Sequence, residues 1–274
     1  MTTILRTRAD DIPRGRWGKP LIIPPGGGEP VLYHRPSTIA KVLDDQSNLL
    51  AWYGRQAIKG VLARPELLDQ ARSDASDDNL KKVAAAAHRA AGSESAADTG
   101  TLAHELTDQF DAGMGIRPGP FEQVIETYGR MVQGLEMLDR ELFVVGDELR
   151  CAGSMDRLIR TQDGTVVVAD LKTGRWAATY GARAAAVQVS IYANSQRYDP
   201  ATGERQPLHP DLDTSKGLLI HLPQDGSEPG LYWLDLNAGH AAAQLAMRVR
   251  ACRSYPMISD RIDPPGRVTL KSEA

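Results

Sequence analysis

The stretch from Gly153 to Tyr192 constrains the fold of this chain more than any other. A β-branched run at 166–168 follows the turn signal Gln-Asp-Gly at 162–164, a pattern typical of a strand buried on both faces. The run leads directly into Asp170-Leu171-Lys172, and because side chains alternate along a strand, Asp170 and Lys172 share one face. Two charged residues at the end of a buried strand require a chemical explanation.

The turn also predicts which residues of the two strands face each other. If the loop is centred on Asp163, residues at equal distances from it are opposed, so Asp156 lies across from Asp170 with Cβ atoms about 4.5–5.5 Å apart. A two-residue Asp-Gly turn would instead oppose Asp156 to Leu171 and turn one carboxylate away. We therefore predict a loop of odd length, or a bulge, with Asp156, Asp170 and Lys172 on one face.

Such a hairpin predicts a metal site. Two close carboxylates repel each other and resist joint ionisation unless a cation lies between them. A hard divalent ion with oxygen ligands relieves the repulsion, and Mg²⁺, which keeps several waters and engages phosphates, suits the site. An Asp-x-Lys tripeptide alone is usually a surface ion pair, and it is the position of this one at the end of a buried strand that favours a metal site.

The composition argues against a membrane protein and against a cysteine-ligated metal site. With 274 residues, 42% of them hydrophobic, the chain can fill one large core. No apolar run approaches the ~20 residues of a membrane span, and the N-terminus has no signal-peptide pattern, so we expect a cytoplasmic protein without a membrane partner. Only Cys151 and Cys252 are present, too few for a four-cysteine iron–sulfur or zinc site. Any metal must therefore have oxygen and nitrogen ligands.

The overall charge gives no signature of nucleic-acid binding, because the net charge is −3. Locally, basic residues gather around the hairpin. They are Arg157, Arg160, Lys172, Arg175 and Arg183. A basic surface beside an acidic pocket suits a phosphate polyanion, although a solvated charged face is the commoner explanation of any single one of these residues.

The order of patterns along the chain predicts an α/β, or α+β-like, core with a helical N-terminal half. Pro- and Gly-rich composition predicts an extended or flexible arm over 1–35, followed by a single domain, 36–274, whose mainly helical part is 36–139. Helices are expected from Ser37, Asn48, Pro65, Asp77 and Thr99, from Pro120 to about Asp139, and at 182–197 and 238–253. Strands are expected at 142–145, from Leu149 to Asp156, at 166–172, at 218–222 and at 231–234.

Polar residues outside the hairpin extend the candidate site. His104 shares a helix face with Asp108 at i and i+4, and Gln188 shares one with Tyr192. Each pair also has a structural explanation, as a hydrogen-bonded helix histidine and as part of an ordinary amphipathic helix. Glu141, at the head of the first strand, is either a site residue or a plain surface residue.

Together these residues resemble the RecB-like branch of the PD-(D/E)XK nuclease superfamily, which includes phage recombination exonucleases. That branch has a helix histidine, a strand glutamate, Gly-x-x-Asp, Asp-x-Lys and Gln-x-x-x-Tyr, in this order. The corresponding segments here are Gly100 to His104, Glu141, Gly153 to Asp156, Asp170 to Lys172 and Gln188 to Tyr192. Residues 36–55 are also similar to the N-terminal helices of such proteins from phages of actinobacteria. The chain departs from relatives that carry a four-cysteine iron–sulfur cluster.

The resemblance implies a restriction-endonuclease-like fold, with a mixed central sheet flanked by helices, and a set of site residues. His104, Asp156, Asp170 and the backbone carbonyl of Leu171 would bind one or two Mg²⁺ or Mn²⁺ ions, with no iron–sulfur cluster. Lys172 would orient or deprotonate the water and offset charge in the transition state. The further implied catalytic residues are Gln188, Tyr192 and Glu141, and the implied DNA-backbone contacts are Arg157, Arg175 and Arg183.

The function implied by the resemblance is a metal-dependent DNA exonuclease in phage or bacterial recombination or replication. The same core could instead be a structure- or sequence-specific endonuclease, or a catalytically silent DNA-binding relative, although the intact Asp, Asp and Lys set disfavours the silent alternative. DNA is the expected partner, and a single-strand annealing or recombination protein is a further candidate. Polarity, strand preference and the choice between monomer and ring stay open.

Overall fold

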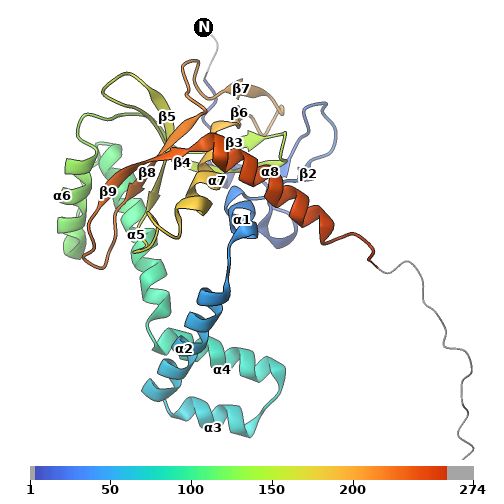
Figure 1. Ribbon diagram of the computed structural model, residues 1–274, viewed down its shortest axis with the longest axis vertical. Helices are drawn as coiled ribbons and strands as arrows, with labels where there is room; N and C mark the ends of the chain where they lie inside the picture. The colour runs from blue at the N-terminus through green and yellow to red at the C-terminus, as the bar shows by residue number, and fades with distance from the viewer. Residues whose placement is uncertain (1–3, 258–274) are drawn as a thin grey trace, which may run out of the picture.

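A mixed β-sheet forms the centre of the molecule (Figure 1). The computed structural model describes residues 4–257, apart from the side chains of 93–97. Within these residues, seven strands have the order β7-β6-β3-β4-β5-β8-β9. The strands are β3 (Glu136–Gly146), β4 (Cys151–Arg160), β5 (Val166–Lys172), β6 (Gln196–Tyr198), β7 (Arg205–Pro207), β8 (Lys216–His221) and β9 (Gly230–Asp235). Strands β5 and β8 are parallel, and the other neighbours are antiparallel. The fold therefore confirms the predicted α/β class with a mixed sheet.

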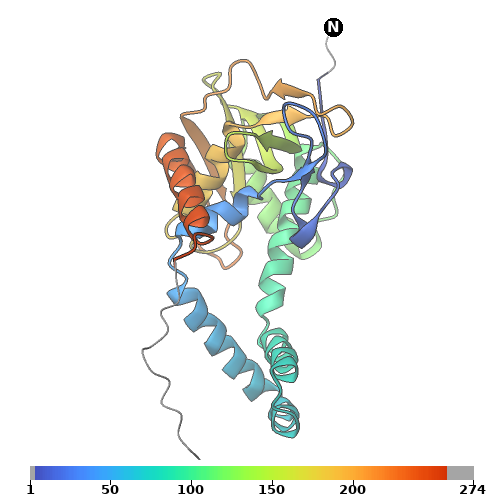
Figure 2. The ribbon, with the colours of Figure 1, turned by 90° about the vertical axis from the view of Figure 1, so that its right-hand side faces the viewer.

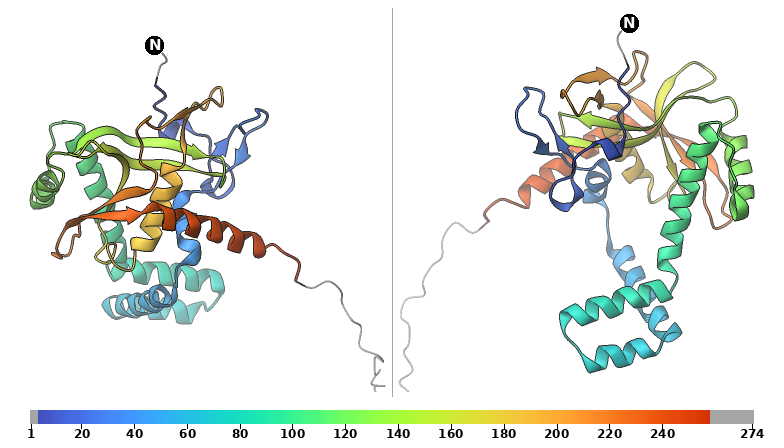
Figure 3. Two further views of the ribbon diagram at one scale, coloured as in Figure 1. Left: turned by 45° about the horizontal axis from the view of Figure 1, so that its top comes forward. Right: turned by 180° about the vertical axis from the view of Figure 1, so that it is seen from behind.

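Helices cover both faces of the sheet (Figure 3). On one face, α7 (Ala182–Ala193) packs on the sheet, with α8 (Leu236–Cys252) against α7. On the other face lies α6 (Glu122–Met131), whose Tyr128 is fully buried against β5. Alternate residues of β5 supply the two cores, because Val168 packs toward α7 and Val167 toward α6. The prediction that this strand is buried on both faces is confirmed.

Part of the helical N-terminal half projects away from the sheet (Figure 2), while its first helix packs against α7 and α8. Its elements are α1 (Pro36–Ala40), α2 (Ser47–Ala63), α3 (Glu66–Ser73), α4 (Asp77–Ala90) and α5 (Ser93–Asp111), with short 3₁₀ helices η3 (Lys41–Leu43) and η4 (Gly119–Phe121). Helix α2 crosses α4 closely at Gly60, where a Cβ would lie 1.8 Å from the carbonyl oxygen of Ala87. The helices begin within a few residues of the predicted starts, with the largest difference at α5, which starts at Ser93 rather than near Thr99. In this part of the chain, no helix combines the length and apolar character that crossing a membrane requires, and the same holds for the other described residues.

The N-terminal segment packs against the sheet over its described part, 4–35. It contains 3₁₀ helices η1 (Ala9–Asp11) and η2 (Arg16–Gly18) and the paired strands β1 (Leu21–Ile22) and β2 (Val31–Leu32). Ile12, Ile22 and Tyr33 are buried in a cluster with Phe143 of β3 and Tyr198 of β6. The Pro- and Gly-rich composition predicted an extended or flexible arm, but these spaced apolar side chains anchor the segment. Residues 1–3 lie outside the described residues.

Two of the predicted helices extend further along the chain than the observed helices do. The helix expected to reach about Asp139 ends at Met131, and after a turn at Gly134, with φ of +86°, β3 begins at Glu136. Leu138 continued the helical spacing, yet in the strand it packs in the core on the α7 side. The helix expected at 182–197 ends at Ala193, and the segment that follows forms β6. Strands β1, β2, β6 and β7 were not predicted, because two or three residues show no periodicity.

The hairpin register is as predicted. Strands β4 and β5 pair Arg160 with Val166 and continue to Arg157 with Ala169, which centres the loop on Asp163. The backbone N–H of Thr161 donates to the carbonyl of Thr165 at 2.9 Å, and the Asp163 carboxylate accepts from the backbone N–H of Thr165 at 3.1 Å. The odd-length loop is thus confirmed, and it aims Asp156 at the end of β5.

Candidate active site

Asp156 stands where the regular pairing of β4 and β5 stops. Its Oδ2 accepts a hydrogen bond of 2.8 Å from the backbone N–H of Leu171, a donor that a carbonyl of the neighbouring strand normally satisfies. Met155 and Leu158 both pack toward α7, whereas strict alternation would place them on opposite faces. The alternation of β4 is therefore interrupted at Asp156, and the interruption fixes its carboxylate beside the exit of β5.

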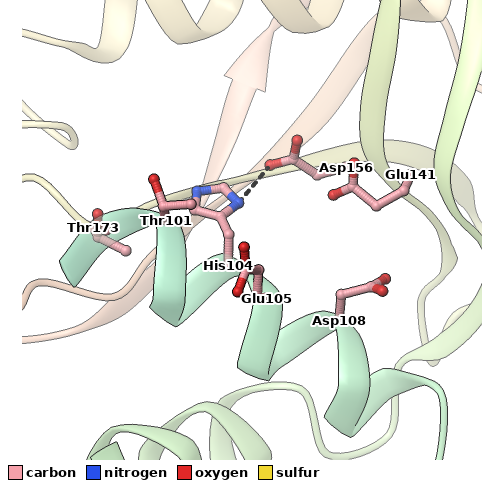
Figure 4. Close-up of a pocket in the computed structure, with 8 residues that line it drawn as sticks. Thr101, His104, Glu105, Asp108, Glu141, Asp156 and Thr173 are labelled. Carbon is pink, nitrogen blue, oxygen red and sulfur yellow. Dashed lines mark ion pairs between the residues drawn. The ribbon is translucent and has the colours of Figure 1, made fainter. Parts of the chain in front are cut away.

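Glu141 occupies the matching irregularity in β3. The ladder pairs Arg140 with Arg157 and Leu142 with Met155, which leaves Glu141 opposite Asp156. Its φ of +46° is rare for a residue other than glycine. Figure 4 shows the Glu141 and Asp156 side chains next to each other at the pocket. Both strands thus depart from regular geometry at the point where their acidic side chains meet.

Asp170 and Lys172 form an ion pair at the end of β5, in which the carboxylate is buried and the lysine side chain is partly exposed. The Asp170 side chain is 1% exposed, and its Oδ2 lies 2.5 Å from Nζ of Lys172. Burial raises the pKa of the Asp170 carboxyl, against the attraction of the ammonium group. Burial acts to lower the pKa of Lys172, but the carboxylates of Asp170 and Asp156 outweigh burial and raise it. Lys172 is therefore a cation at neutral pH.

Helix α7 supports this ion pair from the side. Gln188 donates from Nε2 to Oδ1 of Asp170 at 3.1 Å and also hydrogen-bonds the hydroxyl of Tyr192 one turn along the helix. Burial, with the nearby Asp156 and Asp170, raises the pKa of Tyr192 well above its ordinary value. Tyr192 is thus a neutral hydroxyl, and the two residues predicted to share a helix face both lie at the site.

Helix α5 brings His104 to the hairpin. Its Nδ1 lies 3.8 Å from Oδ2 of Asp156 (Figure 4), and its ring also hydrogen-bonds the backbone of Leu171. Burial lowers the pKa of His104 despite the attraction of Asp156, which favours the neutral imidazole that can bind a metal. Gly100 permits the approach of the helix, because a Cβ there would lie 2.9 Å from Oγ1 of Thr173.

A pocket of about 570 Å³ lies between α5 and the ends of the irregular strands. Its lining comprises Gly100, Thr101, His104, Glu105, Asp108, Glu141, Asp156 and Thr173. Burial, with the nearby carboxylates of Asp156 and Asp108, raises the pKa of Glu141 to about 7. Burial is the larger cause, and the repulsion by the two neighbouring carboxylates is the part that a bound cation would relieve.

The donor chemistry of the pocket fits a hard divalent ion. An imidazole and several carboxylates are the ligands that Mg²⁺ and Mn²⁺ accept. As the side chains stand in the described part of the chain, no three His, Cys, Asp or Glu residues enclose a single ion position. Among the four expected ligands, His104 and Asp156 line the pocket, Leu171 contributes backbone beside it, and Asp170 is held by Lys172 and Gln188.

The basic residues expected to contact DNA lie in different environments. Arg157 is 2% exposed and is bonded to Asp111, Tyr128 and Thr107, with its Nε 2.6 Å from Oδ2 of Asp111. This interior position does not support a phosphate contact. Arg175 and Arg183 are exposed, Arg175 in the loop after Lys172 and Arg183 in the first turn of α7.

Several pocket residues were absent from the expected set. Glu105, Asp108, Thr101 and Thr173 all line the cavity. The i, i+4 spacing with His104 carried the signal for Asp108, whose carboxylate pairs with Arg140 at 2.5 Å. Thr173 directly follows the Asp-x-Lys tripeptide. Glu105 and Thr101 had no comparable signal, since polar residues on an exposed helix face are common.

Comparison with known proteins identifies the family of the chain. No curated protein matches the chain significantly. The family model of the PD-(D/E)XK nuclease superfamily matches residues 49–206, more than half of the chain, and the matched range includes the hairpin, His104 and Tyr192. The seven-strand mixed sheet of the described residues is consistent with the restriction-endonuclease-like fold of that superfamily. The chain therefore belongs to the PD-(D/E)XK nuclease superfamily.

Proposed function

We propose that this protein is a metal-dependent DNA exonuclease of the RecB-like phage branch, acting in recombination or replication. Membership of a nuclease superfamily supports hydrolysis of DNA phosphodiester bonds. The observation that carries the proposal is the Asp170–Lys172 ion pair, buttressed by Gln188, at the edge of a pocket lined by His104, Glu141 and Asp156.

The proposed ligands of one or two Mg²⁺ or Mn²⁺ ions are His104, Asp156, Asp170 and the Leu171 carbonyl, with Glu141 close by. Such an ion, when bound, would lower the pKa of its water and offset negative charge on the phosphate. Neutral His104 and the carboxylate oxygens of Asp156 supply the donors. The raised pKa of Glu141 keeps part of this carboxyl protonated near neutral pH, so it can also hold a proton beside the reacting phosphate.

The role proposed for Lys172 follows from its charge. Because the nearby carboxylates raise its pKa, Lys172 acts first as a cation that stabilises the negatively charged transition state, rather than as a base. Gln188 fixes the orientation of Asp170, and Tyr192 fixes Gln188, so both are positioning residues. The exposed Arg175 and Arg183 would contact the DNA backbone, which makes binding weaker as salt increases.

End-labelled linear single- and double-stranded DNA and covalently closed circular DNA test the proposal. Each is incubated with Mg²⁺, Mn²⁺ or chelator and with wild type, Lys172→Ala or the exposed control Lys82→Ala on α4. We expect metal-dependent release of short products from linear DNA alone, lowered about 10²–10³-fold in Lys172→Ala and unchanged in Lys82→Ala. Circular dichroism verifies that both variants are folded.

The other outcomes contradict distinct parts of the proposal. Cleavage of the closed circle by wild type would identify an endonuclease. Wild-type rates in Lys172→Ala would remove the lysine from the active site. Failure of wild type to cleave any substrate with either metal, while still binding DNA, would identify a catalytically silent relative.

A further inference from the structure

The loop between β5 and α7, residues 173–181, presents exposed aromatic rings. Trp176 is 55% exposed and Tyr180 is 84% exposed, and their ring centroids are 5.8 Å apart in an edge-to-face arrangement. Backbone hydrogen bonds hold the loop, including Gly181 N–H to the carbonyl of Trp176 at 2.9 Å and Ala177 N–H to the carbonyl of Gly174 at 3.0 Å. The rings are therefore displayed by a structured turn rather than by a loose strand of chain.

The loop begins at the candidate active site. Its first residue, Thr173, lines the pocket that contains His104 and Asp156, and it directly follows Lys172. At Gly174 the loop is tied to the sheet, because its carbonyl lies 3.0 Å from Nε2 of the buried His221. The aromatic rings are therefore displayed by the loop that starts at the proposed reaction centre.

Positive charge accompanies the rings. The guanidinium carbon of Arg175 lies 4.7 Å from the centre of the Trp176 ring, and Arg183 is exposed at the start of α7, two residues beyond Gly181. Arg175 also pairs with Asp225 at 3.4 Å, a contact between exposed side chains that is weak in water. A ligand that offers both flat apolar faces and phosphates would satisfy rings and cations together.

We propose that Trp176 and Tyr180 form a stacking platform for unpaired bases, so that the substrate is single-stranded DNA. This inference rests on the proposed nuclease function and specifies its substrate. In a duplex the base faces are covered by neighbouring pairs, whereas in a single strand they are free to stack on aromatic side chains while basic groups follow the backbone. An apolar protein surface would use the rings, but it would leave the Arg175 cation over the Trp176 ring unused.

Equilibrium binding in chelator tests the platform without requiring catalysis. Fluorescence anisotropy compares a labelled oligothymidylate of about twenty nucleotides with a duplex of equal length, at one salt concentration. Trp176→Ala/Tyr180→Ala is expected to bind the single strand about tenfold more weakly or worse and the duplex within twofold of wild type. Trp176→Phe/Tyr180→Phe, which keeps the rings, is expected to restore single-strand binding.

Trp233→Ala is the matched control. Trp233 is 54% exposed and has the ammonium of Lys216 4.9 Å from its ring centre, but it lies on β9 next to Leu234, which packs toward α7. The β8–β9 ladder pairs Trp233 with Leu218, three residues before His221, the residue that contacts the loop at Gly174. Trp233 is therefore outside the loop, and its loss is expected to leave both affinities unchanged. An oligomer with abasic sugars is expected to bind wild type and the double alanine variant equally, because it has phosphates without bases.

Other results would overturn the platform. Unchanged single-strand affinity in the double alanine variant would show that the rings bind something else, such as a protein. Equal losses for single strand and duplex, or for the abasic oligomer, would show that the loop contacts backbone rather than bases. Because no cleavage is measured, failure of the platform is distinguishable from failure of the proposed nuclease activity, which Lys172→Ala tests.

Discussion

Replacing Glu141 with glutamine tests whether the carboxylates of the candidate site destabilise the fold. Burial and the neighbouring Asp156 and Asp108 raise the pKa of Glu141 from 4.5 to about 7. The folded protein therefore holds a proton that the unfolded chain releases, and stability falls as pH rises between these values. The contribution of Glu141 is fully present below pH 4.5 and is lost as pH passes through 7. Glutamine, which carries no charge, removes this dependence.

The size of the effect follows from the same values. The gap between 4.5 and about 7 corresponds, at ~1.36 kcal/mol per pH unit, to a ceiling of about 3 kcal/mol. Glu141 is partly exposed, so water screens the repulsion and we expect about 1–2 kcal/mol at pH 8. For a chain of this length, that is a rise in Tm of roughly 2–8 °C. At pH 5 the two proteins should differ by much less.

Thermal unfolding of wild type and Glu141→Gln at pH 5 and pH 8, in chelator, measures the difference. Glu126→Gln on α6 is the control, because this carboxyl is exposed on the helix surface and such substitutions usually change stability by less than about 0.5 kcal/mol. Charge repulsion at Glu141 is refuted if Glu141→Gln is no more stable than wild type at pH 8, or if its advantage is the same at both pH values. In the second case the gain would come from packing rather than from charge.

The remaining predictions concern the framework around the site. Gly60→Ala places a Cβ 1.8 Å from the Ala87 carbonyl oxygen, so α2 and α4 must separate and the variant should lose about 1–3 kcal/mol of stability. Gly54→Ala, whose Cβ faces open space in the described structure, should instead stabilise α2 by up to about 1 kcal/mol. Thermal unfolding distinguishes the two variants, and equal effects would contradict the close crossing. Arg157→Ala leaves Asp111 buried without its cation and should cost about 3–5 kcal/mol in urea unfolding. Adding Asp111→Ala should recover part of that loss, and a fully additive double variant would disprove the pairing.

The hairpin could be predicted from sequence because its determinants are local. A β-branched run fixes the strand, and a loop centred on Asp163 fixes the register, so a residue count alone directs Asp156 to the end of β5. The Gln188 and Tyr192 pair follows in the same way from the spacing of a helix. Each inference needs only the repeat of one element and the positions of its residues in the chain.

The environment of Arg157 could not be predicted in this way. Its partners Asp111 and Tyr128 come from α5 and α6, 46 and 29 residues earlier in the chain, and only the packing of these helices brings them together. From sequence, the arginine is one of several basic residues near an acidic pocket. The helix overruns at Leu138 and beyond Ala193 have a related cause, because apolar spacing that suits a helix also suits a strand packed on both faces.

The side chains of β4 stop alternating between the sheet faces at Asp156, and this irregularity affects both the stability of the fold and the proposed active site. A regular β4 would turn Asp156 and Arg157 to opposite faces and satisfy the Leu171 N–H with a carbonyl. In the folded protein the Asp156 carboxylate accepts the hydrogen bond from that N–H, and Glu141 adopts a positive φ opposite Asp156. Acidic side chains therefore crowd the pocket above the buried hydrogen-bond network of Arg157. The crowding lowers stability as Glu141 ionises, whereas the Arg157 network holds β4 to α5 and α6 directly beneath it. Neighbouring strands thus carry the destabilising carboxylate, Glu141 on β3, and the contacts that offset it, those of Arg157 on β4, which explains why Arg157 belongs to the support of the site rather than to its DNA-binding surface.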